Sequence, residues 1–300
     1  MEKEILPGKR RRAPVVNGIF YPDDREALTS HLASWGLREG SIETDYGNNQ
    51  TEKDASGFGG QAILAPHGAW ELTGNIAGRA FAAVQEREAK TGRSIARVLL
   101  FSNHHYPAEE GIYLSESASF GTPLGDLVVD GNLNRELASC SPRIKIYDIP
   151  HLSEHALEVL LPLVKYCFPG AKIVPILMSG TNNRLISDLA YALKTVLREH
   201  TEENLFVISS NVSQDPDPAL ALSMADTFRG LISDMDSRGF LSSLAGGRIS
   251  ACGSALIAAL LESDLLHGKH FSSLCPMTQA AGENGETVYY SAFDCTPMEY

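Results

Sequence analysis

The chain has 300 residues, of which 43% are hydrophobic and 21% are charged, a balance that is ordinary for a soluble globular protein. Its formal net charge of −12 disfavours binding to nucleic acid or to an anionic membrane surface. The charged N-terminus does not resemble a signal peptide, and no apolar stretch approaches the ~20 residues that span a bilayer. We therefore expect a cytoplasmic protein that binds neither nucleic acid nor membranes.

Cysteine usage and the one basic run agree with this expectation. The five cysteines are an odd number without a C-x-x-C pair, which predicts free thiols in a reducing compartment. The basic run KRRR at 9–12 is short and close to the N-terminus. Such a run is typical of a solvated arm rather than of a nucleic-acid contact.

The N-terminal part of the chain is predicted to contain one helix and one long loop. In the segment APVVNGIFYPDD, Asp23 or Asp24 is placed to cap a helix that runs through Trp35. Residues 40–60 are polar and rich in glycine, which predicts a loop. The first strand of a sheet is expected only after this loop.

Two apolar runs predict strands near a site. Residues 62–65 form a short run that Pro66 ends, because proline has no N–H to give to a central ladder. Residues 98–101 form a second run, of the kind found in strands buried on both faces of a parallel sheet. Between these runs, the spacing of the apolar residues predicts an amphipathic helix over 73–90.

Strands and helices alternate through the rest of the chain. Ser153 is placed to cap one of these helices, and Pro162 is placed to kink or restart it. The predicted strands cover 111–116, 171–178, 204–210 and 287–293, and the predicted helices cover 134–139, 153–168, 183–200, 218–237 and 250–263. This alternation predicts an α/β fold with a largely parallel central sheet flanked by helices on both faces. Because no repeat, linker or low-complexity tract interrupts it, we expect one domain over residues 1–300.

Histidines follow both of the apolar runs. His67 comes directly after Pro66, and His104 and His105 end the stretch RVLLFSNHH. Residues at the carboxyl ends of parallel strands lie over the crevice where open α/β sheets bind ligands. We therefore expect His67 and His104 to meet at one rim of the sheet. The alternative for each histidine is that its ring only hydrogen-bonds a loop.

Two further segments carry residues suited to a site. His151 and His155 have the i, i+4 spacing of helical imidazoles that share a metal, but the segment lacks the H-E-x-x-H order of zinc proteases. We therefore interpret His155 and Glu158 as a pair that lines the site, with the carboxylate orienting the imidazole. Cys252 lies just before or inside the first turn of an apolar helix, where the helix N-terminus favours the thiolate. A small buried cysteine without a function is the alternative.

Seven motifs, in this order, resemble one known family. They are NGIFYPDD, LAPHGAW, LFSNHHY, TPLGDLVVD, SEHALEVLLP, FVISSNVSQD and ACGSALI, and together they extend over nearly the whole chain. The set resembles the Memo family, whose bacterial and archaeal members are called AmmeMemoRadiSam system protein B. The resemblance implies a fold similar to that of the class III extradiol dioxygenases, which use a non-haem Fe(II) site at the edge of an α/β sheet.

The resemblance also implies a metal pocket. Two histidines and a cysteine line this pocket in Memo proteins, and they correspond here to His67, His104 and Cys252. Fe(II) is the metal expected if the protein is active, and copper or zinc also suits imidazole and thiolate ligands. The residues then expected to have catalytic roles beside the metal are His105, His155 and Glu158.

Departures from the family pattern leave more than one function open. Asn211 stands in place of an acid, Leu160 in place of a histidine, and Gln214 in place of the histidine that moves protons in the related dioxygenases. An amide cannot titrate to do so. One hypothesis is a metal-dependent, dioxygenase-like oxidation with O₂, and metal-assisted hydrolysis would use the same site. The alternative is a non-catalytic module that binds a small molecule or a peptide in the same cleft.

Overall fold

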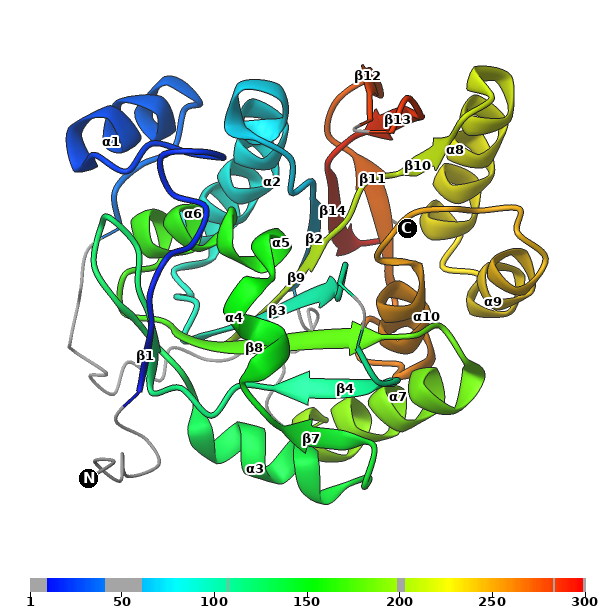
Figure 1. The fold of residues 1–300 in the computed structure, drawn as a ribbon, viewed down its shortest axis with the longest axis horizontal. Helices are drawn as coiled ribbons and strands as arrows, with labels where there is room; N and C mark the ends of the chain where they lie inside the picture. Colours follow the sequence, from blue (N-terminus) through cyan, green and yellow to red (C-terminus); the bar gives the residue numbers. More distant parts are fainter. Residues whose placement is uncertain (1–9, 41–60, 107, 199–202, 283, 299–300) are drawn as a thin grey trace.

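The two apolar runs that precede the histidines lie close together in one large sheet (Figure 1). The structure is a computed structural model, and it describes residues 10–40, 61–106, 108–198, 203–282 and 284–298. Strands β2 (Gln61–Ala65) and β3 (Arg97–Asn103) both pair in parallel with β9 (Asn204–Ser209), which lies between them. On the other side of β3, β8 (Lys172–Ser179) continues the parallel order.

Antiparallel pairings extend this parallel centre on both sides. The order of the eight strands is β11-β14-β2-β9-β3-β8-β4-β7, with β14 antiparallel to β2 and β4 antiparallel to β8. The outer strands are β4 (Gly111–Leu114), β7 (Ile144–Ile146), β11 (Lys269–Ser273) and β14 (Phe293–Pro297). The predicted fold class, an α/β protein with a largely parallel central sheet, is therefore confirmed.

Two small sheets accompany the large one. Their strand orders are β1-β5-β6 and β10-β13-β12. The first contains β1 (Arg11–Arg12), β5 (Ser119–Phe120) and β6 (Leu127–Val128), and the second contains β10 (Ser213–Asp215), β12 (Thr278–Ala281) and β13 (Thr287–Tyr290). The predicted last strand over 287–293 is therefore divided, because 287–290 belong to β13 and Phe293 begins β14 of the large sheet.

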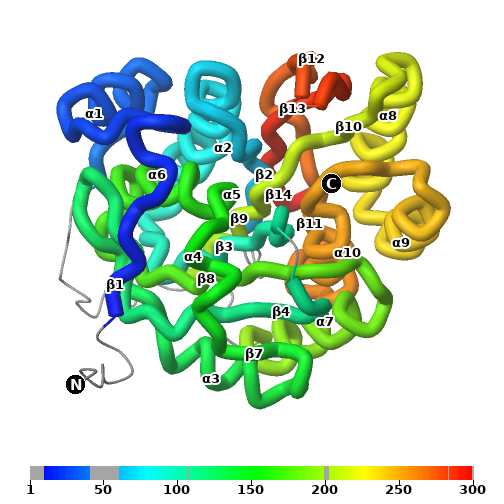
Figure 2. Tube along the Cα trace, in the orientation of Figure 1, coloured from blue at the N-terminus to red at the C-terminus, as the bar shows by residue number. Residues whose placement is uncertain are grey.

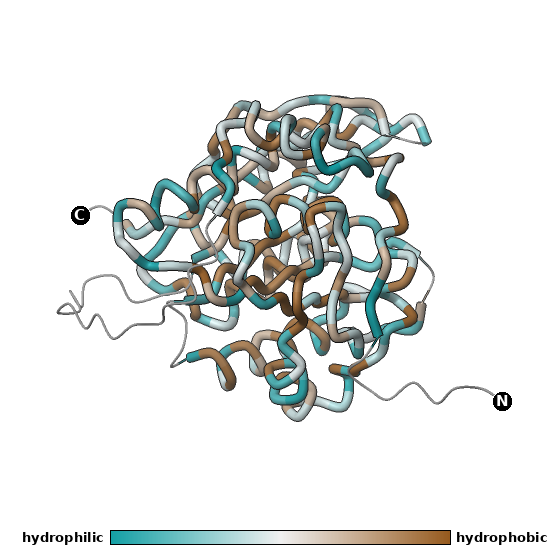
Figure 3. Tube along the Cα trace, turned by 90° about the vertical axis from the view of Figure 1, so that its left-hand side faces the viewer, coloured by the Kyte–Doolittle hydropathy of each residue, from teal (hydrophilic) through white to brown (hydrophobic). Residues whose placement is uncertain are grey.

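Helices cover both faces of the large sheet, as predicted. Successive residues of a strand point to opposite faces, so Phe206 and Val207 of β9 belong to different apolar clusters. The cluster of Phe206 includes residues of α3 (Gly131–Ser139), α7 (Asn183–Leu197), α8 (Pro218–Ser233), α9 (Ser237–Ala245) and α10 (Ser254–Glu262). The cluster of Val207 includes residues of α1 (Arg25–Ser34), α2 (Trp70–Thr91) and α6 (Leu161–Cys167). Figure 3 shows the hydrophobic segments gathered in the interior between these layers.

The helix predicted over 153–168 is not continuous, because residues 149–167 form three short helices, and of the two alternatives for Pro162 the restart is confirmed. The three helices are α4 (Ile149–Ser153), α5 (His155–Glu158) and α6. Glu154, rather than Ser153, caps α5: its backbone is extended, with ψ of 120°, and its side chain accepts a hydrogen bond from the Ala156 N–H. The extended backbone at Glu154 interrupts the helix, and Pro162 lies in the first turn of α6, where its missing N–H has no partner to lose.

Near the N-terminus, one prediction is confirmed and another is wrong. Asp24 caps α1 by accepting from the Ala27 N–H. Arg12, however, is only 4% exposed, so the basic run is not a solvated arm at this position. Of the predicted loop at 40–60, all but residue 40 lies outside the described residues. Within the described part of the chain, no helix has both the length and the apolar composition needed to cross a bilayer.

Candidate metal centre

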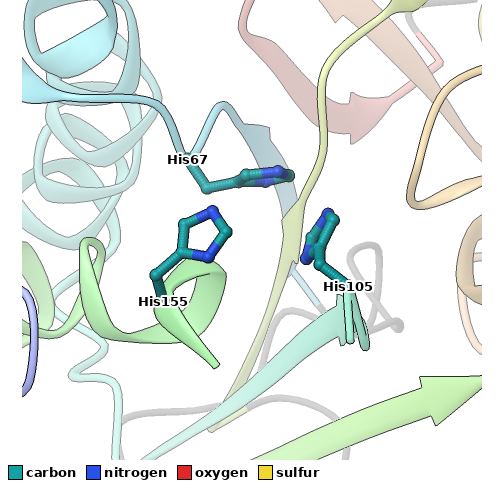
Figure 4. Close-up of side chains that lie close together, drawn as sticks. All are labelled: His67, His105 and His155. Carbon is teal, nitrogen blue, oxygen red and sulfur yellow. The ribbon is translucent and has the colours of Figure 1, made fainter. Parts of the chain in front are cut away.

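The site forms where the two histidine-bearing strands end. β2 and β3 run in the same direction because both are parallel to β9, so the residues that follow them lie at the same edge of the sheet. His67 comes two residues after the end of β2, and His104 and His105 come directly after β3. A fourth histidine, His155, approaches from α5 at the same edge (Figure 4).

Three imidazoles converge at this edge. One nitrogen from each of His67, His105 and His155 lies within 4.8 Å of the other two, a separation that would let a single ion touch all three (Figure 4). The ring centroids are 5.1 Å apart for His67 and His105, 5.2 Å for His105 and His155, and 5.9 Å for His67 and His155. These residues come from three segments that are far apart in the sequence.

Hydrogen bonds fix the tautomer of His67. The Ser209 hydroxyl donates its only hydrogen to the Ala156 carbonyl at 2.7 Å, so it must accept at its 3.0 Å contact with His67 Nδ1. Nδ1 of His67 therefore carries a hydrogen, and Nε2 is the ring atom whose lone pair can be offered to an ion. That lone pair is what a metal ion requires of an imidazole ligand.

Cys252 adds a thiol beside the imidazoles. Its Sγ lies 3.6 Å from His67 Nε2 and accepts from the Asn211 backbone N–H at 3.4 Å. Cys252 precedes α10, whose N-cap is Gly253, and the Gly253 N–H donates to Ser210 Oγ at 2.8 Å. The turn that carries the thiol is thus attached to the segment that follows β9.

The charges of the cluster favour a thiolate and an imidazolium before any metal binds. Burial alone would raise the pKa of Cys252, but the charges of His67 and His105 and their hydrogen bonds to the sulfur hold this pKa well below its usual range. Burial alone would lower the pKa of His105, but its hydrogen bonds to Cys252 and Glu154 raise it to about 10. Burial and the neighbouring His67 lower the pKa of His155 to about 4, so this ring is neutral at pH 7.

Glu154 is the carboxylate that orients the cluster, and the sequence analysis missed it. Its two oxygens accept from the backbone N–H of His105 at 2.7 Å and from His105 Nδ1 at 2.9 Å. Oε1 also lies 3.4 Å from His155 Nδ1. Burial opposes the charge, yet the bonds from His105 and Ala156 lower the pKa of Glu154 to about 2. The only sequence signal was its position next to His155.

Glu158, predicted to pair with His155, makes its hydrogen bonds to the N-terminal segment. Its carboxylate forms an ion pair with Arg12 at 2.7 Å and accepts from the backbone N–H groups of Val15 and Val16, both at 2.8 Å. The Tyr21 hydroxyl donates to it at 3.0 Å. Figure 2 shows this segment, in blue, running past α4 and α6. Whether Glu158 also has a catalytic role stays a prediction.

Arg12 connects the same segment to the middle of α4 and to its C-cap residue. Its Nε donates to the His151 carbonyl at 2.5 Å, and its Nη2 donates to the Glu154 carbonyl at 3.0 Å. Phe20, farther along the segment, packs against His155 with the ring centroids 5.1 Å apart and the ring planes tilted by 41°. The N-terminal segment therefore holds the backbone on which Glu154 and His155 are presented.

The other two histidines named from the sequence lie outside the group of three. His104 is 8% exposed, its backbone N–H donates to the Met178 carbonyl, and burial lowers its pKa. Neither ring nitrogen of His104 makes a hydrogen bond to the described residues. His151 is buried in α4 with its Nε2 3.1 Å from the Tyr113 carbonyl. Its spacing from His155 therefore does not bring the two rings to one helical face.

Comparison with known proteins identifies the family. The family profile described as Memo-like protein matches residues 12–290. The chain belongs to the Memo-like family. Among curated relatives, a MEMO1 family protein of Nitrosopumilus maritimus is 25% identical and aligns over 92% of this chain and 95% of its own. A MEMO1 family protein of Aeropyrum pernix is 28% identical over 86% of this chain and 89% of its own.

The family predicted from the seven motifs is thus confirmed. Among solved structures, the uncharacterized protein JW3007 of Escherichia coli K12 aligns with 78% of this Memo-family chain and 98% of its own. Its sequence identity is 12% and the TM-score is 0.47.

Proposed function

We propose that this Memo-family chain binds one transition-metal ion with His67, His105, His155 and Cys252, and that it uses the ion in an oxidation with O₂. The observation that carries the proposal is the convergence of the three imidazoles from β2, β3 and α5 on one point, with a thiolate beside them. The ligand set differs from the one implied by the family resemblance in having His105 where His104 was expected.

The residues present fit a metal ion in the direction of two ring nitrogens, in the partners of the other ring nitrogens, and in the chemistry of the donor atoms. The hydrogen bond to Ser209 leaves Nε2 of His67 free, and the hydrogen bond to Glu154 leaves Nε2 of His105 directed away from that carboxylate. A histidine ligand commonly gives its other ring N–H to a carboxylate or an oxygen in this way. Imidazole and thiolate together suit iron, copper and zinc. Zinc has no redox chemistry, and of the two redox-active ions we propose Fe(II) for the oxidation.

The chain's own residues provide the ligands and their orientation. A bound iron ion would supply an electrophilic and redox-active centre. His155 is neutral at pH 7 because its pKa is lowered to about 4, so its ring can offer a lone pair to the ion without first losing a proton. Glu154 holds His105 through two hydrogen bonds, and the N-terminal segment holds Glu154, so the imidazoles are oriented before a ligand arrives.

Oxygen consumption by the iron-loaded protein tests the proposed oxidation. The protein is loaded anaerobically with Fe(II), the unbound iron is removed, and O₂ uptake is measured with small organic substrates. Uptake that requires both substrate and iron, and that is lost together with the iron in His155→Ala, supports the oxidation. Iron retained without substrate-dependent uptake contradicts it.

A non-catalytic binding module is the second candidate, and one observation favours it. The segment after β9 carries the amide Asn211 beside Cys252 and the amide Gln214 next to Asn211, and an amide does not titrate to act as a general acid or base. A ligand that binds the iron-loaded protein tightly and is recovered unchanged, without O₂ uptake, would decide for this candidate.

A further inference from the structure

Two amide side chains form a short hydrogen-bonded chain that begins at Cys252. The backbone N–H of Cys252 donates to Asn211 Oδ1 at 2.9 Å. Asn211 Nδ2 in turn donates to Gln214 Oε1 at 2.9 Å. Asn211 also contacts the sulfur itself, through its backbone N–H. Gln214 is therefore joined to the thiol-bearing turn by two consecutive hydrogen bonds.

The direction of this chain is fixed by its first donor. A backbone N–H can only donate, so the atom of Asn211 that faces Cys252 must be the oxygen, and its other terminal atom must be the NH₂. Since that NH₂ donates to Gln214, the atom of Gln214 that receives the bond must be its oxygen. The remaining terminal atom of Gln214, Nε2, is consequently an NH₂ that can only donate.

The surroundings hold Gln214 in place and leave Nε2 accessible. Its backbone N–H donates to Ser250 Oγ at 2.9 Å, so the strand that carries it is tied to the loop that precedes Cys252. Asn211 is 4% exposed, whereas Gln214 is exposed. The neighbouring carboxylate of Asp215 caps a turn by accepting from the Asp217 N–H, and it lies on the opposite face of β10 from Gln214.

We propose that Gln214 determines ligand specificity by donating from Nε2 to an anionic oxygen, such as a carboxylate, of a ligand bound at the His/Cys cluster. The proposal rests on the proposed metal site, because the ion and Gln214 would hold the same ligand. Nε2 of Gln214 is fixed as an NH₂ by the donation from the Cys252 backbone N–H. It therefore discriminates against a cationic ligand group, because an NH₂ has no lone pair to accept a hydrogen bond from such a group. Gln214 is thus a donor to a ligand oxygen, and the charge of a carboxylate strengthens this hydrogen bond.

The test uses Co(II) as the metal and acetate as the probe. Co(II) gives a visible spectrum with thiolate and imidazole ligands, and acetate is titrated into the loaded protein while this spectrum is followed. Gln214→Glu replaces the donor by a charged acceptor of the same shape. Gln214→Leu removes the donor without adding charge. Gln279→Glu is the matched control, because Gln279 is an exposed amide of the same small sheet whose Oε1 accepts from the Tyr289 hydroxyl.

Acetate should bind Gln214→Glu at least about tenfold more weakly than the wild type, and Gln214→Leu about three- to tenfold more weakly. Gln279→Glu should bind acetate as the wild type does. Equal acetate affinity in all four proteins, each carrying stoichiometric cobalt, overturns the role of Gln214 and leaves the metal site standing. A wild type that binds no cobalt overturns both proposals. A loss in Gln279→Glu equal to that in Gln214→Glu shows a general charge effect and also overturns the inference.

Discussion

The two carboxylates at the ends of α5 have opposite surroundings, although both are buried. Glu154 faces the histidine cluster, and Glu158 faces the N-terminal segment, where it pairs with Arg12. On a continuous helix, residues with i, i+4 spacing would share one face. They do not share one here because Glu154 is an extended N-cap residue. One short turn therefore separates a carboxylate that orients the proposed metal ligands from one that anchors the turn itself.

The largest expected effect is a loss of unfolding free energy when the ion pair of Arg12 and Glu158 is broken. Arg12→Met leaves the Glu158 carboxylate buried without its cation, and breaking a buried pair in this way costs about 3–5 kcal/mol of unfolding free energy. Arg11→Met is the matched control, because Arg11 pairs with Asp126 at the surface, where such pairs contribute about 0–1 kcal/mol. Urea unfolding of the two variants measures the difference. Equal losses would show that the burial of Arg12 has no energetic consequence.

A change at Glu154, the orienting carboxylate, should lower the metal affinity rather than the free energy of unfolding. Glu154→Gln keeps the shape of the side chain but weakens the hold on His105, and loss of such an outer carboxylate lowers metal affinity about 10- to 100-fold. Competition with a chelator of known affinity measures it. Glu158→Gln should lower the unfolding free energy more than the metal affinity, and the reverse pattern would contradict the division of roles.

Thiol reactivity provides the smallest and most local test. Because the pKa of Cys252 lies well below its usual range, the metal-free protein carries the thiolate at every pH above that value. The rate of alkylation of Cys252 by iodoacetamide should then hardly change between pH 6 and 8, whereas an ordinary cysteine, with a pKa near ~8.5, reacts faster as the pH rises. His105→Ala removes one of the stabilising partners and should make the rate increase with pH. Peptide mass spectrometry separates Cys252 from the other four cysteines. A rate in the wild type that rises with pH as in an ordinary cysteine would contradict the ion pair with His105.

The sequence was sufficient for the sheet and for the edge at which the site forms. Unbroken apolar runs followed by histidines predicted β2 and β3, and parallel pairing through β9 brings their ends together. The sequence did not indicate which of the two histidines after β3, His104 or His105, faces the cluster. His104 extends the ladder by donating to Met178, and the chain then turns at His105 towards Glu154. That turn depends on a contact with a residue 49 positions away.

Glu154 could not be found from local spacing for the same reason. Its extended backbone is stabilised by hydrogen bonds to His105 and by Arg12, which donates to its carbonyl. Helical periodicity instead assigned the orienting role to Glu158 and a capping role to Ser153. Where tertiary hydrogen bonds interrupt a helix, the spacing of residues along the sequence no longer predicts which side chains share a face.

Metal content after anaerobic Fe(II) loading tests the central claim most directly, with His104→Ala and His105→Ala as a matched pair of neighbouring histidines. If His67, His105, His155 and Cys252 hold the ion, the wild type and His104→Ala each retain one iron per chain after removal of unbound metal, and His105→Ala retains much less. A wild type that retains no iron, or a loss in His104→Ala while His105→Ala stays loaded, would contradict this assignment.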